Sequence, residues 1–232
     1  MADPQIPSRL LQIDEITRAE HFYICEGDLC YHLWEYVKGG RFQEYSTNQL
    51  ILNLQIPLSE RTNKPYRWRY KSVAVQFAAS ALSRVVPQDF FQYFTWVPTP
   101  PSGGRGSALH DPRLTEVLRE VRPPIPDMRE LVYQVVEHTS KEKGLTPEAR
   151  AADFLIDERV ADPAPARLVV FDDVLTTGSH FKAMQLVLSR RFPGVPVMGV
   201  FLARRLTPPE PKVPDIDLDA FLAQFLQKGT GR

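Results

Sequence analysis

The chain has 232 residues, of which 43% are hydrophobic; this provides enough apolar side chains for a packed core and excludes an intrinsically disordered chain. Its 28 basic and 28 acidic residues give a net charge of zero, which argues against a polybasic nucleic-acid or membrane binder. Two cysteines cannot form a disulfide framework. No apolar run reaches the length of about 20 residues that a membrane-spanning helix needs, and the first residues do not have the pattern of a secretory signal. We therefore expect a cytoplasmic protein without a membrane segment.

The first 60 residues have weak periodicity and lead into a polar boundary at 59–65. Within them, the segment NQLILNLQI (48–56) carries leucine or isoleucine at every second position from 50 to 56, which predicts a strand. A helix is predicted over 71–86, because apolar residues recur there at intervals of four: Val73, Phe77, Ala81 and Val85.

The middle of the chain alternates apolar runs with proline-rich connections. The run YFTWVP (93–98) predicts a strand, and the loop TPPSGGRGS (99–107) follows it. Asp111 followed by Pro112 predicts a helix start, in which the carboxylate caps the helix and proline is its first residue; the helix continues over 114–121.

Two more helices are predicted before the last third of the chain. The first covers 127–138, with Asp127 as its cap and a buried stripe formed by Met128, Leu131, Val132, Val135 and Val136. The second covers 147–155, because Thr146 and Pro147 repeat the combination of a capping residue and proline.

The last third predicts a βαβ unit. The apolar run RLVVF (167–171) is typical of a strand buried on both faces of a parallel sheet, a helix capped by Ser179 follows, and 195–203 forms the next strand. We therefore expect an α/β fold with an open, mostly parallel sheet flanked by helices over 61–206. Residues 207–232 are expected to form a linker and an amphipathic helix, which would dock on the same fold or on a second subunit.

The most informative segment is LVVFDDVLTTGSHF (168–181). A buried strand delivers two adjacent carboxylates, Asp172 and Asp173, to its carboxyl end, and a turn containing Gly178 leads into a helix. Glycine permits a tight turn, while the free N–H groups of a helix start bind phosphate. The carboxylates repel phosphate but suit ribose hydroxyls or a magnesium ion. A sugar that carries a 5′-phosphate is therefore a consistent ligand.

This segment resembles the phosphoribosyl-pyrophosphate (PRPP) signature of type I phosphoribosyltransferases. Over about 65–206, the layout is most similar to the ComF-like branch of that family, through WVPTPPSGGRG (96–106) and GLTPEARAADF (144–154). The resemblance implies a central parallel sheet, a hood formed by residues 1–60, and a ligand site at the strand ends. It also implies Mg²⁺-dependent transfer of ribosyl 5-phosphate from PRPP to a nitrogenous acceptor, with release of pyrophosphate.

The resemblance also implies a role for individual residues. Asp172 and Asp173 would bind the ribose hydroxyls directly or through Mg²⁺, and with Arg105 they form the expected catalytic set. The 5′-phosphate would be held by Thr176, Thr177, Gly178 and Ser179. The pyrophosphate loop would comprise Thr99, Ser102, Gly103, Gly104 and Arg105. Lys141 and Lys143 would belong to a mobile lid that neutralises pyrophosphate as it closes.

Two departures from the family pattern bear on function. Thr176 stands where the hypoxanthine-guanine branch has an aspartate base, which argues against a 6-oxopurine acceptor. His180 stands where many members have threonine, so phosphate affinity is in question. An alternative function is therefore a module that senses PRPP or a nucleotide within a larger assembly without turnover. A further alternative, which rests on family analogy alone, is an accessory role in DNA uptake or processing.

One other motif interleaves aromatic and basic residues, YRWRYK (66–71). Such a pattern stacks on and neutralises single-stranded nucleic acid in some proteins. Because the net charge of the chain is zero, we instead expect a helix start with buried rings and outward-facing basic side chains.

Overall fold

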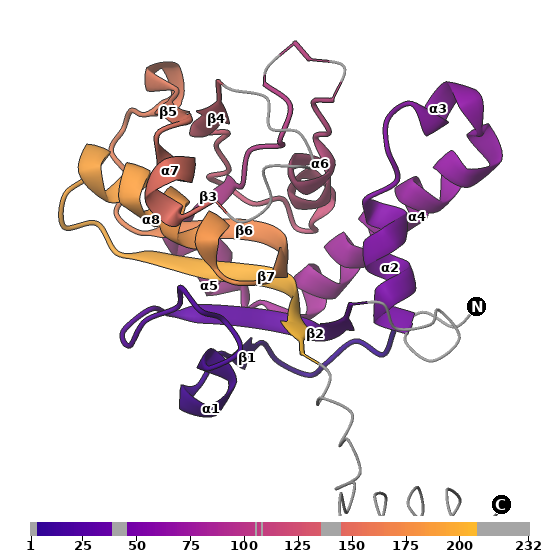
Figure 1. Cartoon of the computed structure of the whole chain (residues 1–232), viewed down its shortest axis with the longest axis horizontal. Coiled ribbons are helices and arrows are strands. Elements are labelled where there is room, and N and C mark those ends of the chain that lie inside the picture. Colours follow the sequence, from indigo (N-terminus) through magenta and orange to yellow (C-terminus); the bar gives the residue numbers. More distant parts are fainter. Residues whose placement is uncertain (1–3, 39–45, 105, 108, 136–144, 208–232) are drawn as a thin grey trace, which may run out of the picture.

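The computed structural model describes residues 4–38, 46–104, 106–107, 109–135 and 145–207. Its main sheet has the strand order β1-β2-β7-β6-β3, with β1 antiparallel to β2 and the other neighbours parallel (Figure 1). The strands are β1 (Leu11–Gln12), β2 (Cys30–Val37), β3 (Thr95–Pro98), β6 (Leu168–Leu175) and β7 (Val197–Leu206). The predicted α/β fold with an open, mostly parallel sheet is confirmed.

Helices cover both faces of this sheet. One layer contains α2 (Ser46–Leu54), α4 (Pro65–Val85), α5 (Gln88–Tyr93) and α6 (Arg113–Glu120), and the other contains α7 (Pro147–Ala151) and α8 (Ser179–Arg191). Successive residues of β6 alternate between the two cores: Val169 and Phe171 pack with α4 and α6, whereas Leu168 and Val170 pack with α8. This alternation explains why the strand is apolar throughout, since both of its faces are buried.

Smaller elements complete the described chain. They are the helices α1 (Glu15–Arg18) and α3 (Glu60–Asn63), the 3₁₀ turn η1 (Glu158–Val160), and a two-stranded antiparallel sheet of β4 (Val132–Gln134) and β5 (Phe154–Ile156). No helix in these described ranges is long and apolar enough to cross a membrane.

The βαβ unit predicted for the last third is confirmed, because β6 and β7 are parallel neighbours joined by α8. The predicted strand at 93–98 and the helix at 71–86 are also present, as β3 and α4. Of the predicted apolar positions on α4, Ala81 and Val85 are buried and Phe77 packs against the core, whereas Val73 is 54% exposed. The buried residues of α4 also include Lys71, Val75, Ala78 and Leu82.

The strand predicted over 48–56 is wrong, since residues 46–54 form helix α2. The helix buries Leu50, Ile51 and Leu54, which share one helical face, and leaves Leu52 38% exposed. Asn48 lies on the buried side and bonds both backbone groups of Val37, so the helix also closes the end of β2.

The helix predicted over 127–138 is also wrong within the described residues, which end at 135. Residues 127–129 run alongside β3 instead, with Trp96 N donating to Asp127 O at 2.8 Å and Arg129 N donating to Trp96 O at 2.9 Å. Asp127 caps no helix; its carboxylate accepts from the Thr95 hydroxyl at 2.6 Å and from Arg129. These bonds cover the free edge of the sheet, which would otherwise expose unpaired backbone groups.

Three helices differ in detail from the expectation, one at its end and two at their starts. Thr146 caps α7 as predicted, but that helix ends at Ala151 and β5 follows. The residue that flanks α6 is Pro112 rather than Asp111, and the residue that flanks α8 is Gly178 rather than Ser179.

The N-terminal 60 residues contribute β1, β2 and α2 to the same sheet and core as the rest of the chain. A hood role for them stays a prediction, and the linker and helix expected within 207–232 lie outside the described residues apart from residue 207.

Candidate functional site

The two segments expected to bind ligand follow neighbouring strands. Because β3 and β6 are adjacent and parallel, the loop after Pro98 and the turn after Leu175 open at the same edge of the sheet. Thr99 N donates to Phe171 O at 2.9 Å, which fixes the start of the loop directly beside the acids of β6. The carboxyl edge is the usual ligand side of an open α/β sheet.

Asp173 is a buried carboxylate held by three donors. It is 6% exposed, and its Oδ2 accepts from Arg113 Nε at 3.0 Å, from Arg113 Nη2 at 2.9 Å and from Gln55 Nε2 at 2.9 Å. Burial alone would raise the pKa of Asp173, but the Arg113 guanidinium and the bond from Gln55 hold this pKa below its ordinary value. Asp173 is therefore a charged, paired group.

Asp172 has a different environment, although it is the next residue in the chain. It is 5% exposed, and its Oδ2 lies 3.5 Å from His180 Nδ1, while Oδ1 accepts from the Asp173 backbone N–H at 2.8 Å. Burial raises the pKa of Asp172, opposed by the interaction with His180. The two acids, equivalent in the sequence motif, thus differ in the direction of their pKa shifts and in their freedom to accept a ligand.

Arg113 belongs to a chain of charged groups that continues into the core. Its Nη1 lies 3.2 Å from Asp111 Oδ2, which also accepts from Lys71 Nζ at 2.7 Å. Lys71 is 2% exposed, and its ammonium group additionally donates to the carbonyls of Leu54 at 2.7 Å and Ile56 at 2.9 Å.

This network fixes several segments relative to one another. The Gln55 side chain bonds Asp173, while the carbonyls on either side of Gln55 accept from the lysine of α4. The end of α2, the interior of α4, the start of α6 and the end of β6 are therefore held together by charge-assisted hydrogen bonds.

The turn between β6 and α8 has the geometry expected of an anion-binding turn. Gly178 has φ +86°, a left-handed conformation that glycine adopts readily, and Ser179 is the first helical residue. Thr176 is exposed, and the Thr177 hydroxyl lies within hydrogen-bond distance of the Ser179 hydroxyl, at 3.4 Å. The start of α8 therefore combines free N–H groups with hydroxyl donors.

The N-terminal segment covers the other side of this turn. Tyr23 N donates to Thr177 O at 2.8 Å, and the buried His21 donates from Nδ1 to Thr176 O. A Cβ atom added to Gly178 would lie 2.7 Å from Ile24 Cδ1, so Gly178 also provides the space for this contact. The carbonyl oxygens of Thr176 and Thr177 therefore accept hydrogen bonds from the N-terminal segment.

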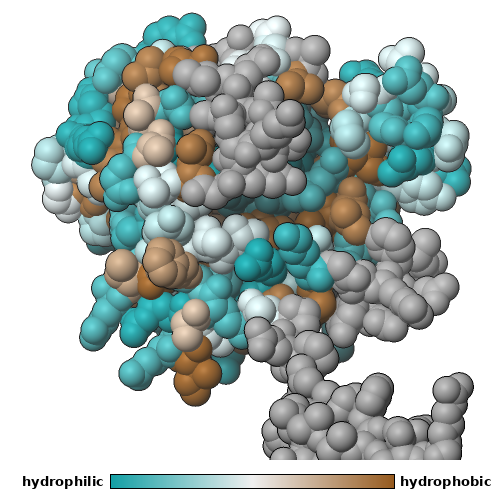
Figure 2. All heavy atoms as spheres, viewed as in Figure 1, coloured by the Kyte–Doolittle hydropathy of each residue, from teal (hydrophilic) through white to brown (hydrophobic). Residues whose placement is uncertain are grey.

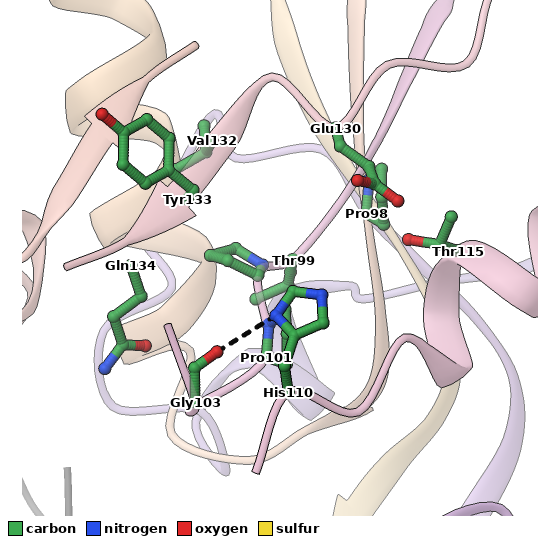
Figure 3. A pocket seen from close by; sticks show the side chains of 11 residues that line it. Pro98, Thr99, Pro101, Gly103, His110, Thr115, Glu130, Val132, Tyr133 and Gln134 are labelled. Carbon is green, nitrogen blue, oxygen red and sulfur yellow. Dashed lines mark hydrogen bonds between the residues drawn. The ribbon is translucent and has the colours of Figure 1, made fainter. Parts of the chain in front are cut away.

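A pocket adjoins the loop that follows β3 (Figure 3). Its lining includes Thr99, Gly103, His110, Glu130 and Tyr133, with His110 Nδ1 lying 3.2 Å from Gly103 O. The Thr99 hydroxyl is buried and has no hydrogen-bond partner among the described residues, so it can donate to a ligand. Neither Asp172 nor Asp173 lines this pocket, which therefore lies beside the acids rather than over them.

The glycines of this loop lie close to neighbouring backbone. A Cβ atom added to Gly103 would lie 2.6 Å from the carbonyl carbon of Leu109, which is too close for any side chain, so only glycine fits at this position. Ser102 and Gly104 belong to the same described loop, whereas Arg105, Lys141 and Lys143 lie outside the described residues.

Arg150 is a further basic residue near Asp172. Its Nε is buried without a hydrogen-bond partner among the described residues, and burial lowers its pKa while Asp172 and Asp153 raise it. The described residues contain no group of three His, Cys, Asp or Glu side chains that could hold a metal, so Asp172 and Asp173 would bind Mg²⁺ only together with ligand or water oxygens.

Sequence reasoning did not identify four side chains of the network that ends at Asp173: Gln55 and Arg113, which contact Asp173, and Asp111 and Lys71, which continue the network into the core. The sequence does carry a signal for the burial of Lys71. This lysine shares a helical face with Val75, Ala78 and Leu82, so it is buried when those apolar residues pack against the core. Gln55 had no such signal, since its contact with Asp173 joins distant segments.

No protein-family model and no curated protein sequence matches this chain.

Proposed function

We propose that this protein binds PRPP with Mg²⁺ and transfers its ribosyl 5-phosphate to a nitrogenous acceptor. The observation that carries the proposal is the juxtaposition at one sheet edge of the Asp172–Asp173 pair, the Gly178 turn at the start of α8, and the loop that begins at Thr99. These features suit, respectively, a diol, a terminal phosphate and a second anionic group.

The 5′-phosphate would be held at the start of α8. The backbone N–H groups of Ser179 and its neighbours point out of the helix, and the hydroxyls of Thr176 and Thr177 add donors. Asp172 would accept the ribose hydroxyls, because Asp173 is already engaged with Arg113. His180, next to Asp172, could donate to the phosphate or to the ribose.

The departing pyrophosphate would lie against the loop of Thr99, Ser102, Gly103, Gly104 and Arg105. The buried Thr99 hydroxyl supplies a donor. Arg105, Lys141 and Lys143, whose roles the family resemblance implies, would supply positive charge. Bound Mg²⁺ would neutralise part of the charge that develops on the leaving group. The C1–O bond breaks, pyrophosphate leaves with the bonding electrons, and the acceptor nitrogen donates its lone pair to C1.

The experiment measures pyrophosphate release from PRPP and Mg²⁺ with a panel of bases and amines. Acceptor-dependent release is expected for the wild type, with a large loss for Asp172→Asn. Asp89→Asn, at an exposed position in α5, is the matched control and should retain activity. The proposal is wrong if PRPP does not bind, or if Asp172→Asn binds it as well as the wild type does.

A second candidate is a sensor that binds PRPP or a nucleotide without turnover. Two observations favour it: Arg113 and Gln55 occupy Asp173, and the N-terminal segment covers the carbonyl side of the turn. Tight PRPP binding by calorimetry, with no pyrophosphate release for any acceptor, would support this function over transfer.

A further inference from the structure

A helical arm extends away from the sheet. It consists of α3 and the first half of α4, residues 60–73, and Figure 1 shows it projecting from the body of the molecule. The rings of YRWRYK were expected to be buried, and this is wrong for the two tyrosines: Tyr66 is 64% exposed and Tyr70 is 44% exposed. Large exposed rings on a projecting element indicate a contact surface.

The two tyrosines share one helical face. They are four residues apart, so their Cβ atoms are separated by about 6 Å along α4. Val73, 54% exposed, extends the same face towards the body of the protein. Trp68 is engaged within the arm, since its ring lies under the Arg61 guanidinium at 6.0 Å and the Lys71 ammonium at 5.5 Å.

The arm concentrates positive charge, although the chain as a whole has none. Besides the buried Lys71, it carries four basic side chains against the acid Glu60: Arg61, Lys64, Arg67 and Arg69. Lys64 and Arg67 both pair with Glu60, at 3.1 and 3.3 Å. The Arg69 guanidinium lies over one face of the Tyr70 ring, 5.2 Å from its centroid, so a base would stack on the opposite face of that ring. In Figure 2 the arm is mostly teal and pale, the colours of strongly and weakly hydrophilic residues.

These features select among possible partners. A second copy of the same face would bring eight basic side chains against two acids, and like charges oppose such an interface. An acidic peptide would complement the charge but would leave the tyrosine rings without flat partners. Single-stranded nucleic acid supplies both phosphates and unpaired bases that stack on exposed rings.

We propose that the arm binds single-stranded nucleic acid, with Tyr66 and Tyr70 stacking on bases and Arg61, Lys64, Arg67 and Arg69 contacting phosphates. This inference does not depend on the proposed phosphoribosyl site. Net neutrality of the chain does not oppose it, because the basic side chains are gathered on one element.

The test is fluorescence anisotropy of the full chain with a labelled oligothymidylate of about 12 nucleotides, a length within the range bound by known single-strand modules. Binding should weaken with salt, with a slope of log K against log salt near −3, because each neutralised phosphate contributes about −0.7. The double change Tyr66→Ala with Tyr70→Ala should weaken binding at least about tenfold, whereas the corresponding phenylalanine variant should bind like the wild type. Arg67→Gln with Arg69→Gln should reduce the salt slope by about 1.4.

Tyr93→Ala is the matched control, since Tyr93 is 61% exposed at the end of α5, outside the arm. All of these positions are exposed, so the variants should fold, and their thermal unfolding verifies this. The proposal is overturned if the oligonucleotide does not bind or if the alanine double variant binds unchanged. It is also overturned if the arm changes abolish self-association, or binding to phosphatidylserine vesicles, and leave oligonucleotide binding intact.

Discussion

Replacement of Lys71 by methionine tests whether the charged network beneath the acids stabilises the fold. Lys71 is 2% exposed and donates to Asp111, to the carbonyl of Leu54 and to the carbonyl of Ile56. Removal of one partner from a buried ion pair costs about 3–5 kcal/mol, because the remaining charge loses its compensation. Asp111 keeps Arg113 at 3.2 Å, which places the expected loss at the lower end, about 3 kcal/mol.

The assay is urea unfolding of the wild type and variant at neutral pH, with the free energy of unfolding extrapolated to water. For a chain of this size, a loss of about 3 kcal/mol also lowers Tm by about 6–12 °C. Lys64→Met is the control. Lys64 belongs to the same region and pairs with Glu60, but its side chain is 46% exposed, so the change should cost less than about 1 kcal/mol.

Equal losses for the two lysine variants would refute this reasoning, because they would mean that burial of the Lys71 ammonium has no energetic consequence. A loss below about 1 kcal/mol for Lys71→Met would refute it as well.

Three further predictions concern the acids, pH and the signature turn. Asp173→Asn should lower the free energy of unfolding by about 2–3 kcal/mol, because the partly buried Arg113 loses one of its two carboxylate partners and keeps only Asp111. Asp172→Asn, at a carboxyl whose pKa burial already raises, should cost less than about 1 kcal/mol, and equal urea midpoints for the two variants would contradict this. Burial lowers the pKa of His32 from 6.5 to about 4, so the unfolded chain binds a proton that the native chain excludes. Stability should therefore fall as pH decreases, by about 2 kcal/mol between pH 7 and pH 5, and His32→Gln should flatten this dependence. Gly178→Ala should lower Tm more than Gly194→Ala does. Both glycines have a positive φ, but of the two positions only Gly178 has neighbours within 4 Å of an added Cβ atom. Equal losses of Tm would show that this contact has no energetic cost.

Local sequence patterns were sufficient where an element has one dominant signal. The run 167–171 is apolar throughout because β6 is buried on both faces, and the alternation of Val169 and Val170 between the two cores confirms that interpretation. The helix at 71–86 was predicted from periodicity, but several apolar stripes coexist on α4. The predicted stripe is buried at Ala81 and Val85 but exposed at its first position, Val73, and the buried face also includes Lys71, which an apolar pattern does not mark.

The failures share a physical cause. Leucines at 50 and 54 fit a strand at a spacing of two and a helix at a spacing of four, and only packing against α4 decides between them. Val132–Gln134 forms a strand because it pairs with Phe154–Ile156, and no local pattern reveals that partner.

The same limit applies to the candidate site. The segment Asp-Asp-Val-Leu-Thr-Thr-Gly (172–178) could be predicted as a unit because strand, turn and helix start are contiguous in sequence. The different environments of Asp172 and Asp173 could not, because they arise from Gln55, Arg113 and His180, two of which belong to distant segments.

The order of the strands has a consequence for synthesis of the chain. β2 lies between β1 and β7, and its register pairs Cys30 with Gly199. During translation, the edge of β2 that pairs with β7 stays open until residues 197–206 have emerged, whereas β6, α8 and β7 meet soon after they leave the ribosome. Until then the nascent chain exposes one edge of a largely apolar strand, which makes residues 30–37 the expected binding site for a chaperone or the starting point for aggregation.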